Sequence, residues 1–201
     1  MTECIYQGSF NPIHNAHLAA AEYAHKKLNF ERIVFIPAFK PPHKDLTCFG
    51  SENALHRLEM LQLAVQNISY FDVSAIEYMR STPSYTYDTI IQLYDIIKPQ
   101  EKISFIIGSD AFRQIESWYR SDELKQLIDF VLFVRENDFD AAPFEQLREK
   151  GYNYTLMDMP FMDISSETVR KRCAEGLPID DLVPKETAGY IKQHALYEIQ
   201  R

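Results

Sequence analysis

Two histidines near the start of the chain are of a type, and at a spacing, that suits work on phosphate. His14 and His17 lie three residues apart at an expected helix start, so their side chains share one helical face. Free backbone N–H groups and the positive end of the helix dipole favour an anion there. Gly8 opens the preceding loop and lets a ligand approach the backbone closely. The segment from Gly8 through Ser9 and Phe10 to His17 therefore predicts a phosphate-binding loop.

A second group of phosphate-binding side chains lies near the C-terminus. Ser165 and Ser166 stand at an expected helix start, where serine hydroxyls cap the helix or donate to phosphate. Arg170 follows about one turn later and can reach the same anion. Taken alone, this pattern also fits a plain helix cap followed by a surface arginine.

The elements that must position these side chains alternate along the chain. Apolar runs predict strands at 4–6, 32–36, 71–73, 103–107, 130–134 and 154–157. Helical spacing predicts helices at 18–28, 55–64, 86–97 and 121–127, a helix start at 165, and a helix from Pro184 to about 196. This alternation predicts an α/β fold, a doubly wound parallel sheet with helices on both faces. We find no repeat or linker, so we expect a single domain over 1–201 with a C-terminal helical part from about 165.

In such sheets, ligands bind beyond the carboxyl ends of the strands, near the point where the strand order reverses. Gly108 and Asp110 follow the predicted central strand and are therefore candidates for the nucleotide site.

Composition excludes several classes of protein. The chain has 201 residues, 46% of them hydrophobic, and a net charge of −8, which fits a globular domain and argues against binding to a nucleic-acid backbone. No apolar window is long enough for a membrane span, and no leader is recognisable at the start. Three widely spaced cysteines, Cys4, Cys48 and Cys173, signal neither a disulfide framework nor a zinc ribbon and favour the cytoplasm.

Several segments together resemble the nicotinate mononucleotide adenylyltransferases, a family of HxGH-type nucleotidyltransferases. The first segment reads QGSFNPIHNAH where the family has GGxFDPxHxGH, so Gln7, Asn11 and Ala16 depart from the pattern. ISSETVR, from Ile164, resembles ISSTxIR, with Glu167 as a departure. Further family motifs are matched along the chain: the PPHK loop by Pro41–Lys44, the HR pair by His56-Arg57, the SYTxDT segment by Ser84–Thr89, the IIGAD strand end by Ile106–Asp110, and the tryptophan after it by Trp118. The resemblance spans essentially the whole chain.

The resemblance implies a Rossmann-like fold and transfer of the adenylyl group of ATP to nicotinate mononucleotide, with release of pyrophosphate, in NAD biosynthesis. It implies His14, His17, Lys44 and Arg170 as catalytic residues that stabilise added negative charge, with magnesium on the ATP phosphates and no metal ligands from protein side chains. It places Gly8, Ser9, Phe10, Gly108, Asp110, Ser165 and Ser166 around ATP. It assigns Tyr85, Thr86 and Trp118 to the pyridine nucleotide, with the indole stacked on the nicotinate ring.

Other interpretations stay open from sequence. The acceptor could be nicotinamide mononucleotide or pantetheine phosphate, or the fold could serve an ATP-binding sensor without turnover. A zinc hydrolase using His14, His17 and His43 is a further alternative, although no Cys or acidic cluster lies in that motif to complete the ligand shell. The sequence is compatible with a homo-oligomer and does not specify one.

Overall fold

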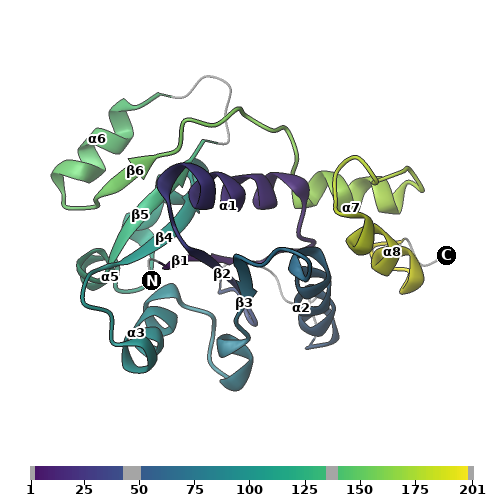
Figure 1. Cartoon of the computed structure of the whole chain (residues 1–201), viewed down its shortest axis with the longest axis horizontal. Coiled ribbons are helices and arrows are strands. Elements are labelled where there is room, and N and C mark those ends of the chain that lie inside the picture. The colour runs from purple at the N-terminus through teal and green to yellow at the C-terminus, as the bar shows by residue number, and fades with distance from the viewer. Residues whose placement is uncertain (1–2, 43–50, 135–139, 199–201) are drawn as a thin grey trace.

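In the computed structural model, which describes residues 3–42, 51–134 and 140–198, a parallel sheet runs through the middle of the molecule (Figure 1). Its six strands are ordered β3-β2-β1-β4-β5-β6, and every neighbouring pair is parallel. Their bounds are β1 Glu3–Gly8, β2 Arg32–Pro37, β3 Phe71–Val73, β4 Ile103–Gly108, β5 Ile128–Phe133 and β6 Tyr154–Leu156. The strand order reverses between β1 and β4, which is the arrangement of a doubly wound sheet.

Helices connect the strands and extend the chain beyond the sheet. They are α1 Asn15–Leu28, α2 Ser51–Val65, α3 Thr86–Ile97, α4 Ser109–Phe112, α5 Ser121–Leu127, α6 Ala142–Glu149, α7 Ser166–Ala174 and α8 Lys185–Gln193, with short 3-10 helices η2 Ile76–Met79 and η3 Ile115–Ser117. In Figure 1, α7 and α8 lie at one end of the molecule beside α2, away from α6 and β6. Among the described residues, no helix is long and apolar enough to cross a membrane.

Alternating side chains of the central strands pack into two hydrophobic cores, one on each face of the sheet. Cys4 and Tyr6 of β1 point into a core with residues of α1, α2 and α8, whereas Ile5 points into a core with residues of α3 to α6. Because successive residues of a strand face opposite sides, one apolar strand fills both cores. The predicted doubly wound α/β fold with helices on both faces is confirmed.

Element ends differ from the prediction where the backbone changes direction. The last helix ends at Gln193 rather than near residue 196, because Ala195 and Tyr197 adopt positive φ values of 48° and 66°. The fifth strand begins at Ile128, two residues earlier than predicted, because Ile128 pairs with Ile103 of β4. Helix α6 was not predicted, although Pro143 stands in its first turn.

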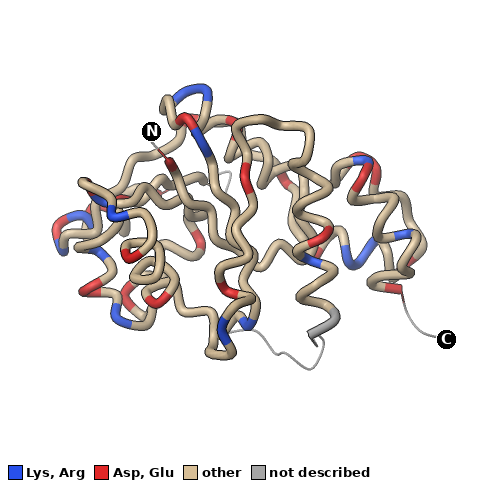
Figure 2. Tube along the Cα trace, turned by 60° about the horizontal axis from the view of Figure 1, so that its bottom comes forward, with Lys and Arg blue, Asp and Glu red and all other residues tan. Residues whose placement is uncertain are grey.

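Charged side chains are mixed along the chain. Figure 2 shows Lys and Arg interspersed with Asp and Glu over the helices at both ends of the molecule, while the trace through the central strands is mainly uncharged. The net charge of −8 is therefore not the charge of any one site.

Candidate active site

A cavity of about 660 Å³ opens at the carboxyl ends of β1 and β4, where the strand order reverses. The loops that follow these two strands diverge there because their helices pack on opposite faces of the sheet. Apart from His14 and Lys44, every predicted site residue lines this cavity: Gly8, Ser9, Phe10, His17, Tyr85, Thr86, Gly108, Asp110, Trp118, Ser165, Ser166 and Arg170. Lys44 and His43 lie outside the described residues. The roles of all these side chains stay predictions.

The loop after β1 is shaped by the contact between Gly8 and Phe10. A Cβ added at Gly8 would stand 3.0 Å from Phe10 Cζ, so the missing side chain leaves room for that ring. Phe10 itself is 2% exposed and has a φ of 44°, in the left-handed region. The sequence analysis expected Gly8 to admit a ligand, and the structure adds that it admits the phenylalanine ring.

The two histidines occupy different depths. Their rings stack with centroids 3.6 Å apart, and His17 Nδ1 accepts a hydrogen bond of 3.3 Å from the His14 backbone N–H. His17 lines the main cavity, whereas His14 is 1% exposed and lines a small neighbouring cavity of about 20 Å³ together with His17. The edge of the Phe10 ring packs against His17 at a centroid distance of 5.1 Å. His17 is thus held from both sides while its ring borders the open space.

The C-terminal part clamps the same loop. Ser166 Oγ donates to the Pro12 carbonyl oxygen at 2.9 Å, and the Arg170 guanidinium donates to the Asn11 carbonyl oxygen at 2.7 Å. Tyr197 Oη donates to Asn11 Oδ1 at 2.8 Å, and burial raises the pKa of that tyrosine. These bonds join segments more than 150 residues apart in sequence and bring Ser166 and Arg170 to the cavity wall.

Ser165 has the capping function that its position predicts. Its Oγ accepts a hydrogen bond of 3.0 Å from the Thr168 N–H, and it stands directly before the first residue of α7. Ser165 therefore both caps the helix and lines the cavity.

Arg57 of α2 braces the loop from beneath and is almost fully buried, at 1% exposure. Its guanidinium donates to the carbonyl oxygens of Ser9 (2.8 Å), Ala38 (2.6 Å) and Phe39 (3.2 Å). Burial lowers the pKa of Arg57, since the charged form is removed from water. One cation thereby fixes the backbone after both β1 and β2.

The opposite wall of the cavity is aromatic. Tyr85 stands immediately before α3, and its ring lies 4.6 Å from that of Tyr119. Trp118 ends the short helix η3 and is partly exposed to the cavity, as is Thr86 at the start of α3. A flat ring can stack in such a pocket while backbone N–H groups at the helix start meet a negative group.

The residues that the structure describes contain no group of three or more His, Cys, Asp or Glu placed to hold a metal ion.

Lys40, in the loop after β2, directs its ammonium to the Ser81 carbonyl oxygen at 3.1 Å.

Three side chains that hold this site received no role in the sequence analysis: Arg57, Glu77 and Tyr197. Arg57 belonged only to the HR pair of the resemblance, and Tyr197 only to the segment that resembles the family's closing helix. Glu77 had one usable signal, because it is a lone acid between the apolar side chains of Ile76 and Tyr78.

Comparison with known proteins shows relatives in sequence and in fold. Residues 5–172 match the model of the family described as Cytidylyltransferase-like. Two curated relatives carry the name "Probable nicotinate-nucleotide adenylyltransferase": one from Carboxydothermus hydrogenoformans, 36% identical over 96% of each chain, and one from Desulfitobacterium hafniense, 38% identical over 97% of this chain and 95% of the other. A solved structure of Plasmodium falciparum nicotinic acid mononucleotide adenylyltransferase complexed with NaAD superimposes with a TM-score of 0.77 at 27% identity, covering 97% of this chain and 96% of that one.

Proposed function

This chain belongs to the nicotinate-nucleotide adenylyltransferase family, and we propose that it transfers the adenylyl group of ATP to nicotinate mononucleotide. The products are nicotinate adenine dinucleotide and pyrophosphate, a step of NAD biosynthesis. The observation that carries the proposal is one cavity in which a phosphate-binding loop, a C-terminal arginine and an aromatic pocket meet. A dinucleotide needs both halves of that cavity.

The reaction requires little acid–base chemistry from the protein. The attacking group is a phosphate oxygen that is already ionised near neutral pH, so no general base is needed to activate it. Catalysis then consists of aligning the attacking oxygen, the α-phosphorus and the leaving pyrophosphate, and of stabilising added negative charge. No covalent enzyme intermediate is required.

His17 and Arg170 are the described side chains best placed for that stabilisation, because both border the cavity beside the backbone of Gly8 to Phe10. His14 acts with His17, since the two rings stack. Ser165 and Ser166 hold the phosphates from the C-terminal side, and Gly108 and Asp110 lie toward the adenosine. Lys44, outside the described residues, completes the proposed catalytic group.

Magnesium enters as part of the substrate, bound to the phosphates of ATP. The ion supplies charge neutralisation at the phosphates.

The pyridine nucleotide occupies the aromatic half. Trp118 stacks on the nicotinate ring. The hydroxyls of Tyr85 and Thr86, together with the Thr86 N–H at the start of α3, meet the anionic ring carboxylate.

We also infer that the protein works in a reducing compartment, the cytoplasm. Cys4 and Cys173 are free, and burial raises the pKa of the Cys4 thiol, which keeps it unreactive.

The test follows pyrophosphate release from ATP and magnesium with each acceptor in turn: nicotinate mononucleotide, nicotinamide mononucleotide and pantetheine phosphate. We expect the first to give the fastest release. No release with any acceptor, despite ATP binding, would favour a nucleotide sensor, and stoichiometric zinc in the purified protein would favour a hydrolase.

His17→Ala tests the assignment of the histidine. We expect turnover to fall by about 10²–10³, the typical effect of losing a stabilising donor, with little change in unfolding temperature. His194→Ala is the matched control, because His194 is exposed and lies outside the cavity lining. Equal turnover in the two variants would remove His17 from the mechanism.

A further inference from the structure

We propose that Glu77 is a positioning residue that holds the pyridine-nucleotide half of the cavity in its binding geometry. The inference rests on the proposed function and adds to it a residue that does not line the cavity.

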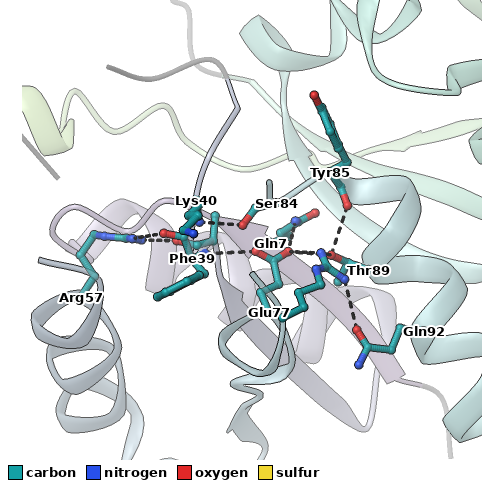
Figure 3. A network of polar contacts seen from close by, with 11 residues as sticks. Gln7, Phe39, Lys40, Arg57, Glu77, Ser84, Tyr85, Thr89 and Gln92 are labelled. Atoms are coloured by element: carbon teal, nitrogen blue, oxygen red, sulfur yellow. Dashed lines mark hydrogen bonds and ion pairs between the residues drawn. The ribbon is translucent and has the colours of Figure 1, made fainter. Parts of the chain in front are cut away.

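Glu77 is fully buried, at 0% exposure, and its carboxylate collects donors from four parts of the chain (Figure 3). Gln7 Nε2 of β1 donates to Oε1 at 2.5 Å, and Thr89 Oγ1 of α3 donates to the same oxygen at 2.7 Å. The Phe39 backbone N–H donates to Oε2 at 3.1 Å, and the Arg80 guanidinium lies 3.6 Å from Oε1. A buried carboxylate is tolerated only with such partners, since an unpaired one loses its solvation without compensation.

The contacts of Glu77 reach the aromatic pocket along two routes. The first runs through Thr89, which stands in the first turn of α3 and lies 3.3 Å from the carbonyl oxygen of Tyr85. Arg80 supports this route, because its guanidinium bonds both Thr89 Oγ1 and Gln92 Oε1. The start of α3, which carries Tyr85 and Thr86, is thereby fixed relative to the carboxylate.

The second route runs through the loop after β2. Phe39, bound to Glu77, precedes Lys40, whose N–H donates to Ser84 Oγ at 2.8 Å while the Ser84 N–H donates to the Lys40 carbonyl oxygen at 2.8 Å. This reciprocal pair joins the loop to the residue before Tyr85. In Figure 3, dashed lines join the Glu77 carboxylate to the side chains of Gln7 and Thr89 and to the backbone of Phe39, while Ser84 is joined to Lys40.

The ATP half has anchors of its own. The Ser9 carbonyl is held by Arg57, the Asn11 carbonyl by Arg170, and the Ala38 N–H donates to the Gly8 carbonyl oxygen at 2.8 Å. None of these bonds involves Glu77, whose contact beside this half is with the side-chain amide of Gln7, the residue before Gly8. Loss of its charge should therefore weaken pyridine-nucleotide binding much more than ATP binding.

The experiment measures KM and calorimetric affinity for nicotinate mononucleotide and for ATP in wild type, Glu77→Gln, Thr89→Val and Thr89→Ser. Glu77→Gln keeps the size of the side chain and removes its charge, and Thr89→Val removes the hydroxyl donor that Thr89→Ser retains. We expect Glu77→Gln and Thr89→Val to raise the KM for nicotinate mononucleotide about tenfold or more, which is the effect of losing one hydrogen bond to a charged group. The KM for ATP should change less than about twofold, and Thr89→Ser should stay near wild type on the same scale. Glu145→Gln, at an exposed ion pair with Arg148, is the surface control.

The outcomes separate the two proposals. A wild-type protein that neither binds nor uses nicotinate mononucleotide overturns the proposed function, and this inference with it. The role of Glu77 alone is overturned if wild type is active and either of two results is found. One is that Thr89→Val and Thr89→Ser have the same KM for nicotinate mononucleotide. The other is that the KM for nicotinate mononucleotide and the KM for ATP rise equally in Glu77→Gln and Thr89→Val. If Glu77→Gln does not fold, the threonine pair still decides, because both variants keep the carboxylate and only Thr89→Val removes the hydroxyl.

Discussion

Replacing Arg57 by methionine should both destabilise the fold and loosen the phosphate-binding loop. Methionine keeps the unbranched apolar stem and removes the guanidinium, which now donates to three carbonyl oxygens, those of Ser9, Ala38 and Phe39. At 1% exposure of the arginine, water has little access to replace these donors. The substitution therefore leaves acceptors unsatisfied on both sides of the cavity floor.

The size of the effect follows from two opposing contributions. Three acceptors left without this partner, one buried and two part-buried, would cost at most about 1–3 kcal/mol each, or roughly 3–9 kcal/mol in sum. Removing a buried cation offsets part of this cost, because the desolvation penalty of the guanidinium disappears. Burial lowers the pKa of Arg57, which means that it penalises the charged form. We expect a net loss near 3 kcal/mol, the lower end of the sum. Arg57→Lys keeps the charge but not the planar set of donors. Its free energy of unfolding should fall by about 1–2 kcal/mol, the contribution of one of the three hydrogen bonds.

Urea unfolding followed by circular dichroism measures this loss as a shift in midpoint at constant slope. Arg148→Met serves as control, since Arg148 is 47% exposed in its pair with Glu145 and an exposed pair contributes about 1 kcal/mol or less. An Arg57→Met protein within about 1 kcal/mol of wild type, no worse than the control, would refute the claim that the guanidinium satisfies these carbonyls.

The positions of the strands and most helices could be predicted from sequence because their signals are local. The apolar run at Ile103–Ile107 must be buried on both faces, and the spacing of Ile90, Leu93 and Tyr94 marks one helical face, so strand and helix α3 were found within a residue or two. The part of the cavity lining that follows β1 and β4 was predictable for a related reason: loops after parallel strands collect at one edge of the sheet. Tyr85, Thr86 and Trp118 were expected there only from the family resemblance.

The supports of the site could not be predicted, because they depend on contacts between distant segments. Glu77 meets Gln7 across 70 positions, and Tyr197 meets Asn11 across 186. No local pattern encodes such pairs. Gln7 stands where the family pattern has glycine, and this replacement suits only an ordinary φ. The structure agrees, since Gln7 is absent from the positive-φ residues and its amide donates to Glu77 instead.

Two further predictions concern Gly8 and Tyr78. Gly8→Ala places a Cβ 3.0 Å from Phe10 Cζ, so the ring must shift from its packing against His17, at a cost of about 1–3 kcal/mol and with reduced turnover. Gly189→Ala lies in α8 with nothing within 4 Å of the added Cβ, so it should instead stabilise the protein by up to about 1 kcal/mol. Thermal unfolding and a turnover assay compare the two glycine variants. Tyr78 governs the alkaline limit of stability, because burial raises its pKa from the usual 10.0 to about 12. The fold favours the neutral phenol, so its contribution to the free energy of unfolding is complete below pH 10 and is lost as the pH rises through 12. Wild type should therefore lose about 2 kcal/mol more than Tyr78→Phe between pH 9 and pH 11.5, measured by urea unfolding, since the other tyrosines titrate alike in both proteins. Equal losses in the two proteins would mean that the Tyr78 hydroxyl is not held neutral by the fold.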